Sequence, residues 1–305
     1  MRCVITQPID SSGYDLLRAA GIEPVAAPST DLPDLAPLLA DTDAVITRNW
    51  GFPLAAMALA PRLRVISVHG TGMDRIAMDE AARRGIPVVA CPGANAQSAA
   101  EHALALMLAV ARSLPLADTA MRNGDFGWRD RIEGVELSGR CLGLWGWGEV
   151  ARRLAPMAQA MGMELLVLTS RADPQELEAA GCARASDENA LLSRADVLSL
   201  HLRAGATPAL GAAQFMAMRA GAILINTARG ALVEEAALVA ALRQGHLRGA
   251  GLDVFTAEPP TDRVLIDCPG LVLSPHIGGS TADARRRMAR ASAKAVVLAL
   301  TGPQP

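Results

Sequence analysis

The sequence predicts an α/β protein with two doubly wound domains, each built around a parallel sheet. Short apolar runs alternate with amphipathic stretches through the first hundred residues, and the same alternation restarts at Cys141. Alternation of this kind is typical of parallel sheets that carry helices on both faces. The chain has 305 residues. Because a single core seldom grows past about 250–300 residues, two domains are expected.

The first sheet is expected to consist of four apolar runs with amphipathic helical stretches between them. The runs lie at residues 3–6, 44–47, 64–68 and 86–90, and one of the amphipathic stretches lies at residues 73–84. A long helix rich in Ala and Leu follows at residues 99–112. Because it is apolar nearly all round, we expect it to be buried between domains or subunits.

The second sheet is expected after an irregular stretch at residues 123–139, which carries Trp128. Its five strands, with a candidate sixth, lie at residues 141–145, 163–169, 196–200, 222–226, 250–254 and 271–275. A helix over residues 282–300 is expected to end at residues 301–303.

Composition excludes several functional classes. The chain carries 29 basic and 31 acidic residues, so it lacks the basic surplus of a nucleic-acid-binding protein. The densest apolar run, residues 103–111, is far shorter than the about 18 residues of a membrane span, and residues 1–9 are too short an apolar run for a signal peptide. The five cysteines are scattered without a C-x-x-C pair, which disfavours a metal site or disulfide framework and favours a reducing cytoplasm.

A glycine-rich turn follows the apolar run at residues 141–145 and precedes a helical pattern. Gly146, Gly148 and Ala151 form the G-x-G-x-x-A version of the dinucleotide fingerprint. Gly146 permits the tight turn, and Gly148 lets a pyrophosphate approach the backbone. Glu149 and Val150 open the helix, whose free N–H groups attract anions. An ordinary strand-to-helix turn is the alternative, but the flanking strand and helix favour dinucleotide binding.

The end of the next strand predicts which dinucleotide is preferred. An NAD-binding chain usually has an acidic residue about 20 positions after the turn, which binds the ribose 2′-hydroxyl. This sequence has Thr169, Ser170 and Arg171 there instead. Small hydroxyls followed by Arg suit a 2′-phosphate, so we expect NADP(H) to be preferred and NAD(H) to be the alternative. Arg171 could otherwise be a solvated surface residue.

Three residues on loops after apolar strands suit the reduction of a 2-keto acid. Arg229 offers a planar cation for the carboxylate and polarises the carbonyl. His276 can donate the proton that the carbonyl oxygen needs as hydride arrives. Glu258 would favour the imidazolium form and orient the ring. Each residue alone could be an ordinary surface or loop residue. Their order, together with the dinucleotide turn, favours a shared active site.

The sequence resembles the D-isomer-specific 2-hydroxyacid dehydrogenases along nearly its whole length, most closely the NADPH-dependent glyoxylate/hydroxypyruvate reductases. The motifs HGTGMD, PGANAQSAAEHALALML, LSGRCLGLWGWG, INTARGALV, GLDVFTAEP and SPHIGG appear in the family's order. The spacings of 29 residues from Arg229 to Glu258 and 18 from Glu258 to His276 also match the family pattern.

The resemblance implies further binding residues. Backbone N–H groups of Gly70, Thr71 and Gly72 are expected to hold the substrate carboxylate opposite Arg229 and His276. Asp253 is expected to bind the nicotinamide carboxamide. The positions that line the cofactor cleft in the family are here His201, Leu202, Thr227, Arg229, His276 and Gly278.

Other positions are assigned with less detail. Arg48 and Trp50 follow a strand and are expected to shape the substrate pocket, and Trp128 to reach a partner subunit's site. His69, His102 and His246 are interpreted as structural or surface residues. Relatives usually have Pro where this chain has Arg203, so the loop near the adenine end differs from the family pattern and offers another cation for a 2′-phosphate.

The resemblance implies a Rossmann-type dinucleotide domain, residues 98–282, inserted in a flavodoxin-like substrate domain, residues 1–97 and 283–305. We expect a cytoplasmic homodimer that reduces glyoxylate, hydroxypyruvate or a similar 2-keto acid with NADPH. One alternative is an NAD(P)-sensing binding protein of the same fold without turnover. Another is an NAD-linked dehydrogenase of D-lactate or D-3-phosphoglycerate.

Overall fold

The computed structural model describes residues 1–205 and 207–302. The chain divides into two compact units, the first formed by Met1–Ala96 with the segment from Gly279 onward, and the second by Gln97–Gly278. The C-terminal boundary of the second unit, between Gly278 and Gly279, therefore falls earlier than the expected boundary between residues 282 and 283. The backbone explains the position, because the N–H of Gly278 donates to Asp253 of the second unit, whereas Gly279 packs against Asn95 of the first. The expected C-terminal segment also includes residues 303–305, which lie outside the described residues.

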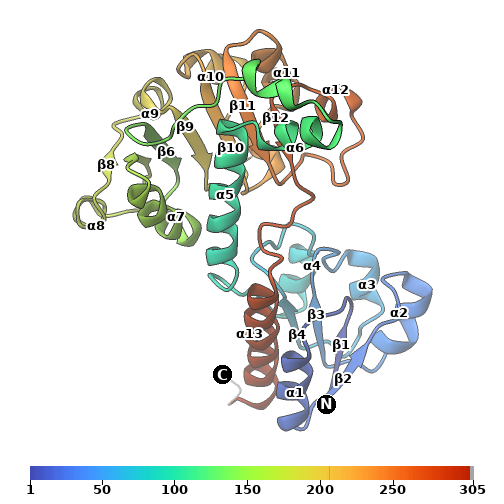
Figure 1. Cartoon of the computed structure of the whole chain (residues 1–305). Coiled ribbons are helices and arrows are strands. Elements are labelled where there is room, and N and C mark those ends of the chain that lie inside the picture. Colours follow the sequence, from blue (N-terminus) through green and yellow to red (C-terminus); the bar gives the residue numbers. More distant parts are fainter. Residues whose placement is uncertain (206, 303–305) are drawn as a thin grey trace. The chain divides into compact units, whose positions relative to one another are not determined.

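The first unit contains a five-stranded parallel sheet in the order β2-β1-β3-β4-β5, which is the flavodoxin-like order. Its strands are β1 (Arg2–Ile5), β2 (Glu23–Ala26), β3 (Ala44–Thr47), β4 (Val65–Val68) and β5 (Val88–Val89). Its helices are α1 (Ser11–Ala19), α2 (Leu32–Leu39), α3 (Leu54–Ala58), α4 (Met78–Arg83) and α13 (Ala282–Thr301). Figure 1 shows α13 beside α1 in this unit.

Helix α13 joins the first unit because it covers one face of that sheet. Its Ala293, Val296 and Leu300 are buried in one cluster with Leu17 of α1 and with strand residues such as Ile46. The other face is covered by α2, α3 and α4. Apolar burial of this kind is the main stabilising term in folding, so a segment distant in sequence completes the N-terminal domain.

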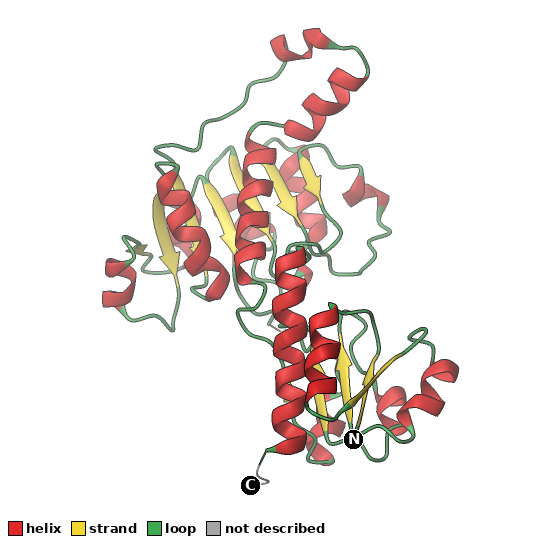
Figure 2. Ribbon diagram, turned by 60° about the horizontal axis from the view of Figure 1, so that its bottom comes forward, coloured by secondary structure: helices red, strands yellow, loops and turns green. Residues whose placement is uncertain are grey.

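The second unit contains a seven-stranded parallel sheet in the order β12-β11-β10-β9-β6-β7-β8, the Rossmann order with one added strand. Its strands are β6 (Cys141–Trp145), β7 (Glu164–Leu168), β8 (Ala183–Arg184), β9 (Val197–Leu200), β10 (Ala222–Asn226), β11 (Leu247–Leu252) and β12 (Leu271–Leu273). Two buried clusters lie on its opposite faces, and Figure 2 shows helices on both sides of the strands. The predicted fold class is confirmed.

The connecting helices of the second unit are short apart from α5 and α7. They are α5 (Ala96–Ala111), α6 (Leu114–Arg122), α7 (Glu149–Ala160), α8 (Pro174–Ala179), α9 (Glu188–Arg194), α10 (Ala212–Ala217), α11 (Glu235–Arg243) and α12 (Arg263–Ile266), with 3-10 turns η1 (Phe126–Asp130) and η2 (Gly230–Leu232). Among the described helices none is both long and apolar enough to cross a membrane by itself, and one bent pair, α5 with α6, passes that test only when taken together.

Helix α5 packs on the sheet of the second unit, and glycines make the close approach possible. A Cβ atom at Gly251 would lie 2.8 Å from Leu106 Cβ, and one at Gly249 would lie 2.7 Å from Val110 Cγ1. Leu106, Met107 and Val110 are buried in the cluster on this face. Much of the apolar surface of α5 is therefore buried by its own sheet, and its expected burial between domains or subunits stays a prediction.

Several expected elements differ in extent, most clearly the helix at residues 73–84 and the strand at residues 86–90. The helix expected at residues 73–84 is present only as α4, because Phe52 and Ile76 form a parallel bridge that holds the residues before α4 extended. Strand β5 is shorter than the run at residues 86–90. Strands β2 and β8 were not predicted, since β2 carries Glu and Pro with no buried side chain and β8 has only two residues.

Candidate active site

The glycine-rich turn lies at the point where the strand order of the second sheet reverses, between β6 and β9. Gly146 has φ +105°, and a Cβ there would lie 2.5 Å from the backbone oxygen of His201. This turn therefore requires glycine. A Cβ at Gly148 would meet nothing within 4 Å. Gly148 directly precedes α7, whose first turn contains Glu149 and Val150. The backbone at the N-terminus of this helix is therefore exposed at Gly148. A pyrophosphate fits this arrangement.

Two arginines stand near the end of β7. The backbone N–H of Arg171 donates to Thr169 Oγ1 at 3.2 Å, and Arg184 Nη2 on β8 donates to the Thr169 carbonyl at 3.2 Å. Ser170 and Arg171 are exposed. The nearest following acid, Asp173, caps α8 by accepting the N–H of Gln175 at 2.9 Å. Arg184 was missed in the sequence because β8 was not recognised.

Other predicted cofactor residues lie at the carboxyl ends of the adjacent strands β9 and β10. His201 Nε2 lies 3.0 Å from Ser199 Oγ, and burial lowers the pKa of His201 to about 4, so this ring is neutral near pH 7. Leu202 is half-buried. Thr227 Oγ1 is buried and has no hydrogen-bond partner among the described residues. Because a buried hydroxyl without a partner is costly, this atom fits the predicted contact with a dinucleotide.

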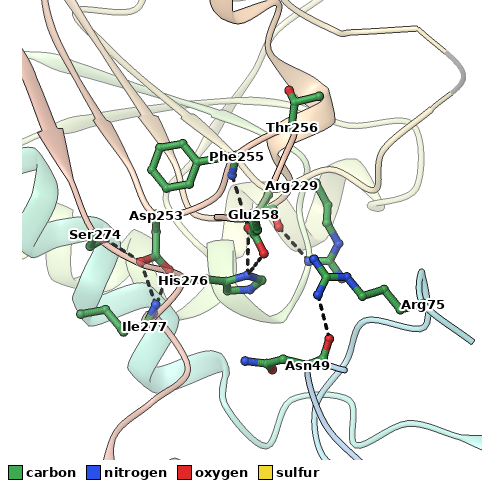
Figure 3. A network of polar contacts seen from close by, with 12 residues as sticks. Asn49, Arg75, Arg229, Asp253, Phe255, Thr256, Glu258, Ser274, His276 and Ile277 are labelled. Atoms are coloured by element: carbon green, nitrogen blue, oxygen red, sulfur yellow. Dashed lines mark hydrogen bonds and ion pairs between the residues drawn. The ribbon is translucent and has the colours of Figure 1, made fainter. Parts of the chain in front are cut away.

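Arg229, Glu258 and His276 follow the neighbouring strands β10, β11 and β12, whose carboxyl ends share one edge of the sheet. His276 Nδ1 lies 3.0 Å from Glu258 Oε2 and 3.1 Å from Oε1. Figure 3 shows the imidazole pointing toward that carboxylate. The predicted pair is therefore formed in the structure.

The Arg229 turn is held against the Glu258 loop by close backbone packing. A Cβ at Gly230 would lie 1.9 Å from the carbonyl carbon of Phe255, so only glycine permits this approach. Asn226 stabilises the turn from within, because its Nδ2 donates to the Arg229 carbonyl at 2.8 Å and its Oδ1 accepts the Ala228 N–H at 3.1 Å. The backbone segments that carry Arg229 and Glu258 are therefore in direct contact.

Asp253 holds the loop that carries His276. Its carboxylate accepts the Ser274 hydroxyl at 2.6 Å and the N–H groups of Ile277 and Gly278 at 2.9 and 2.8 Å, as Figure 3 shows for Ser274 and Ile277. Burial raises the pKa of Asp253, but hydrogen bonds from His102, Ser274 and the two N–H groups outweigh it, so the net pKa is lowered. Asp253 is thus an ionised, buried carboxylate. Contact with a carboxamide stays a prediction.

The predicted carboxylate-binding loop belongs to the first unit. Gly70 has φ +155° and its carbonyl accepts the Cys91 N–H at 2.8 Å, while Thr71 is exposed and Gly72 half-buried. The preceding His69 is buried, and its Nε2 lies 3.2 Å from the Arg285 carbonyl. The role of the loop stays a prediction.

The remaining assignments are placed as follows. Arg48 donates to the Pro8 carbonyl at 2.6 Å, and the Trp50 ring packs edge-on against Phe52 at 6.3 Å between centroids. His246 Nε2 lies 3.1 Å from the Met218 carbonyl, which agrees with a structural role. Trp128 lies half-buried in η1, and Arg203 is exposed. Their proposed roles at a substrate, partner or cofactor are not tested by these contacts.

A family model and two curated relatives match this chain, and their matches agree with one another. The model of the D-isomer specific 2-hydroxyacid dehydrogenase NAD binding domain matches residues 104–278. Glyoxylate reductase of Thermococcus litoralis is 38% identical over 254 residues, which are 81% of this chain and 76% of that protein. D-3-phosphoglycerate dehydrogenase of Mycobacterium tuberculosis is 38% identical over 279 residues, 89% of this chain. The chain spans about half the length of that relative, 52%.

One solved structure has a similar fold along nearly the whole chain. The NADPH-dependent glyoxylate/hydroxypyruvate reductase of Sinorhizobium meliloti superposes with a TM-score of 0.88 at 27% identity, covering 99% of this chain and 95% of that one. Together with the matched dinucleotide domain and the strand orders described above, this likeness establishes the relationship. The chain belongs to the D-isomer specific 2-hydroxyacid dehydrogenase family.

Proposed function

We propose that this protein is an NADPH-dependent reductase of small 2-keto acids, with glyoxylate or hydroxypyruvate as favoured substrates. The observation that carries the proposal is the contact of 3.0 Å between His276 Nδ1 and Glu258, on the strand edge shared with Arg229. A carboxylate on Nδ1 leaves Nε2 as the ring atom that exchanges a proton. When bound, the nicotinamide supplies the hydride.

Each residue of the site then has a separate task. Arg229 binds the substrate carboxylate and polarises the keto oxygen. His276 donates its Nε2 proton to that oxygen as negative charge develops there, and takes a proton back in the reverse direction. Glu258 stabilises the imidazolium and fixes the ring orientation. Asp253 keeps the backbone under His276 in place.

The preference for NADP(H) is supported by the cations at the end of β7. The Arg171 backbone N–H and the Arg184 guanidinium both donate to Thr169, the Arg171 side chain is exposed, and Asp173 caps α8. Charge-assisted hydrogen bonds from guanidinium groups suit a 2′-phosphate. A second structure of the Sinorhizobium meliloti reductase, which matches this chain at 26% identity, was solved in complex with NADP and malonate. A comparison of kcat/KM with NADPH and NADH tests this preference, and a more than about tenfold preference for NADH contradicts it.

A second candidate activity is oxidation of D-3-phosphoglycerate or reduction of its keto form. A relative that is 38% identical is named D-3-phosphoglycerate dehydrogenase. A screen of glyoxylate, hydroxypyruvate, pyruvate and phosphohydroxypyruvate, with both cofactors, separates the candidates. The highest kcat/KM with the phosphorylated acid favours this second activity. No turnover on any of these acids favours the non-enzymatic alternative, a protein that only binds the dinucleotide.

We also propose a homodimer formed through α5 and the segment after it. Leu108 of α5 is exposed, as are Leu114, Leu116, Met121 and Phe126 after it, and exposed large apolar side chains favour an interface. Light scattering after gel filtration tests the assembly, and a monomer at micromolar concentration contradicts it. The contribution of Trp128 to a partner's site and the cytoplasmic location stay predictions.

A further inference from the structure

We propose that His102, on α5, is a positioning residue that fixes the backbone presenting His276 by acting through Ser274 and Asp253. This inference rests on the proposed role of His276 in proton transfer. His102 was interpreted from the sequence only as a structural or surface residue. Its contacts in the second unit connect it with the loop after β12.

The backbone at His276 is in a conformation that histidine rarely adopts. Its φ is +54°, in the left-handed region that is unfavourable for a residue with a side chain. Such a conformation persists only where surrounding contacts enforce it. The contacts that hold His276 in this backbone conformation are therefore part of the active site.

Three consecutive N–H groups of this loop converge on Asp253. The N–H of His276 donates to the Asp253 carbonyl at 2.8 Å, that of Ile277 to Oδ1 at 2.9 Å, and that of Gly278 to Oδ2 at 2.8 Å. Asp253 is 1% exposed. A buried carboxylate must keep all its donors to remain ionised without penalty, so the orientation of this side chain determines the path of the loop.

His102 completes the donor set of that carboxylate. The Ser274 hydroxyl donates to Asp253 Oδ1 at 2.6 Å, so its oxygen must accept the hydrogen that bridges it to His102 Nε2 at 2.8 Å. Nε2 therefore carries a hydrogen, and it also lies 3.2 Å from Asp253 Oδ1. The result is a chain of donors that runs from His102 through Ser274 to Asp253.

Close packing leaves the loop little room to adjust. A Cβ at Gly278 would lie 2.9 Å from Asp253 Oδ2 and 3.6 Å from His102 Cδ2. The His102 side chain is 20% exposed, on a helix whose Ala100 and Ala103 are buried against the sheet. A rigid helix therefore holds the donor, and loss of that donor removes a fixed point from the loop.

The test uses two substitutions at His102 and one matched control. His102→Leu removes the donor and keeps the bulk, whereas His102→Gln can place an N–H near the former Nε2. We expect His102→Leu to lower kcat about tenfold and leave KM for NADPH within about twofold, because small misplacement of a reacting group is costly. His102→Gln should recover kcat to within about threefold of the parent. His246→Leu, which removes another half-buried histidine of this unit, should lower Tm without lowering kcat.

A second readout does not depend on turnover. The chain has five histidines, so the NMR signal of the His276 Cε1–H group can be assigned by its loss in His276→Asn. We expect this signal to move or broaden in His102→Leu and to return in His102→Gln. An inactive parent would contradict the proposed function, while the NMR comparison would still test the role of His102.

The proposal is overturned if folded His102→Leu keeps both the parent kcat and the parent His276 signal, or if Leu and Gln variants lose activity equally. If His102→Leu does not fold, Ser274→Ala replaces it, since it cuts the link between His102 and Asp253. A reduced kcat with a displaced His276 signal in Ser274→Ala supports the proposal, and parent behaviour in both measurements contradicts it.

Discussion

His276 Nδ1 contacts both carboxylate oxygens of Glu258, at 3.0 Å to Oε2 and 3.1 Å to Oε1. The carboxylate can only accept hydrogen bonds when ionised, so Nδ1 is the protonated nitrogen of this pair. The geometry therefore leaves Nε2 to face the reaction.

Replacing Glu258 with Gln should lower kcat by about ten- to a hundredfold, because the amide keeps the size of the side chain but removes the charge that favours the imidazolium. Steady-state kinetics with the preferred keto acid measure the loss. Glu164→Gln, which changes an exposed charged residue of β7, is the control for net charge. Parent-like kcat in Glu258→Gln would exclude the proposed role of the carboxylate.

The two arginines at the end of β7 should determine cofactor choice. Changing Arg171 and Arg184 together to Ser should lower kcat/KM for NADPH by about ten- to a hundredfold and leave that for NADH within about threefold, because hydrogen bonds to a charged phosphate are lost. Arg263→Ser, which removes an exposed arginine of α12, is the matched control. If kcat/KM falls equally for NADPH and NADH, these residues do not bind the 2′-phosphate.

The two glycines of the turn should separate folding from binding. Gly146→Ala should destabilise the protein by about 1–3 kcal/mol, because its φ is +105° and its Cβ would meet the His201 carbonyl. Gly148→Ala should leave Tm unchanged, since its Cβ meets no protein atom, but should weaken dinucleotide binding. Thermal unfolding and fluorescence titration with NADPH measure the two effects. Parent-like NADPH affinity in Gly148→Ala would place the pyrophosphate elsewhere.

His69 should make the protein less stable in mild acid. Burial, followed by the charge of Arg48, lowers the pKa of His69 to about 4 from the ordinary value of 6.5. The unfolded chain therefore binds a proton that the folded chain does not, and stability falls as pH decreases from about 6.5 to about 4, by up to about 3 kcal/mol. Urea unfolding across this range should show a weaker pH dependence in His69→Gln. Identical pH dependence in parent and variant would contradict the prediction.

The sequence predicted the elements whose signal is local and strong. Strands β3, β6 and β10 have the predicted bounds, because each is a continuous apolar run that is buried on both faces. The pair His276–Glu258 was also predicted, since the family motifs and their spacing identify both residues. Strand β8 was missed because two exposed residues give no periodic signal, and with it Arg184 was missed.

Tertiary contacts determine what the sequence left open. The bridge between Phe52 and Ile76 shortens the helix expected at residues 73–84, and no pattern within that segment reveals it. The helix at α5 was predicted, but its partner surface depends on glycines in β11, more than a hundred residues away. His102 was assigned no specific role because its significance comes from Ser274 and Asp253, which reach it only in the folded chain.

The role of His276 as proton donor is tested most directly by the kcat of His276→Asn, measured together with the affinity of this variant for NADPH. We expect kcat to fall by about a hundred- to ten-thousandfold, the usual contribution of a general acid. NADPH should bind as in the parent because the turn at Gly146 and Gly148 is intact. Turnover within about threefold of the parent would contradict the assignment of His276 as the proton donor.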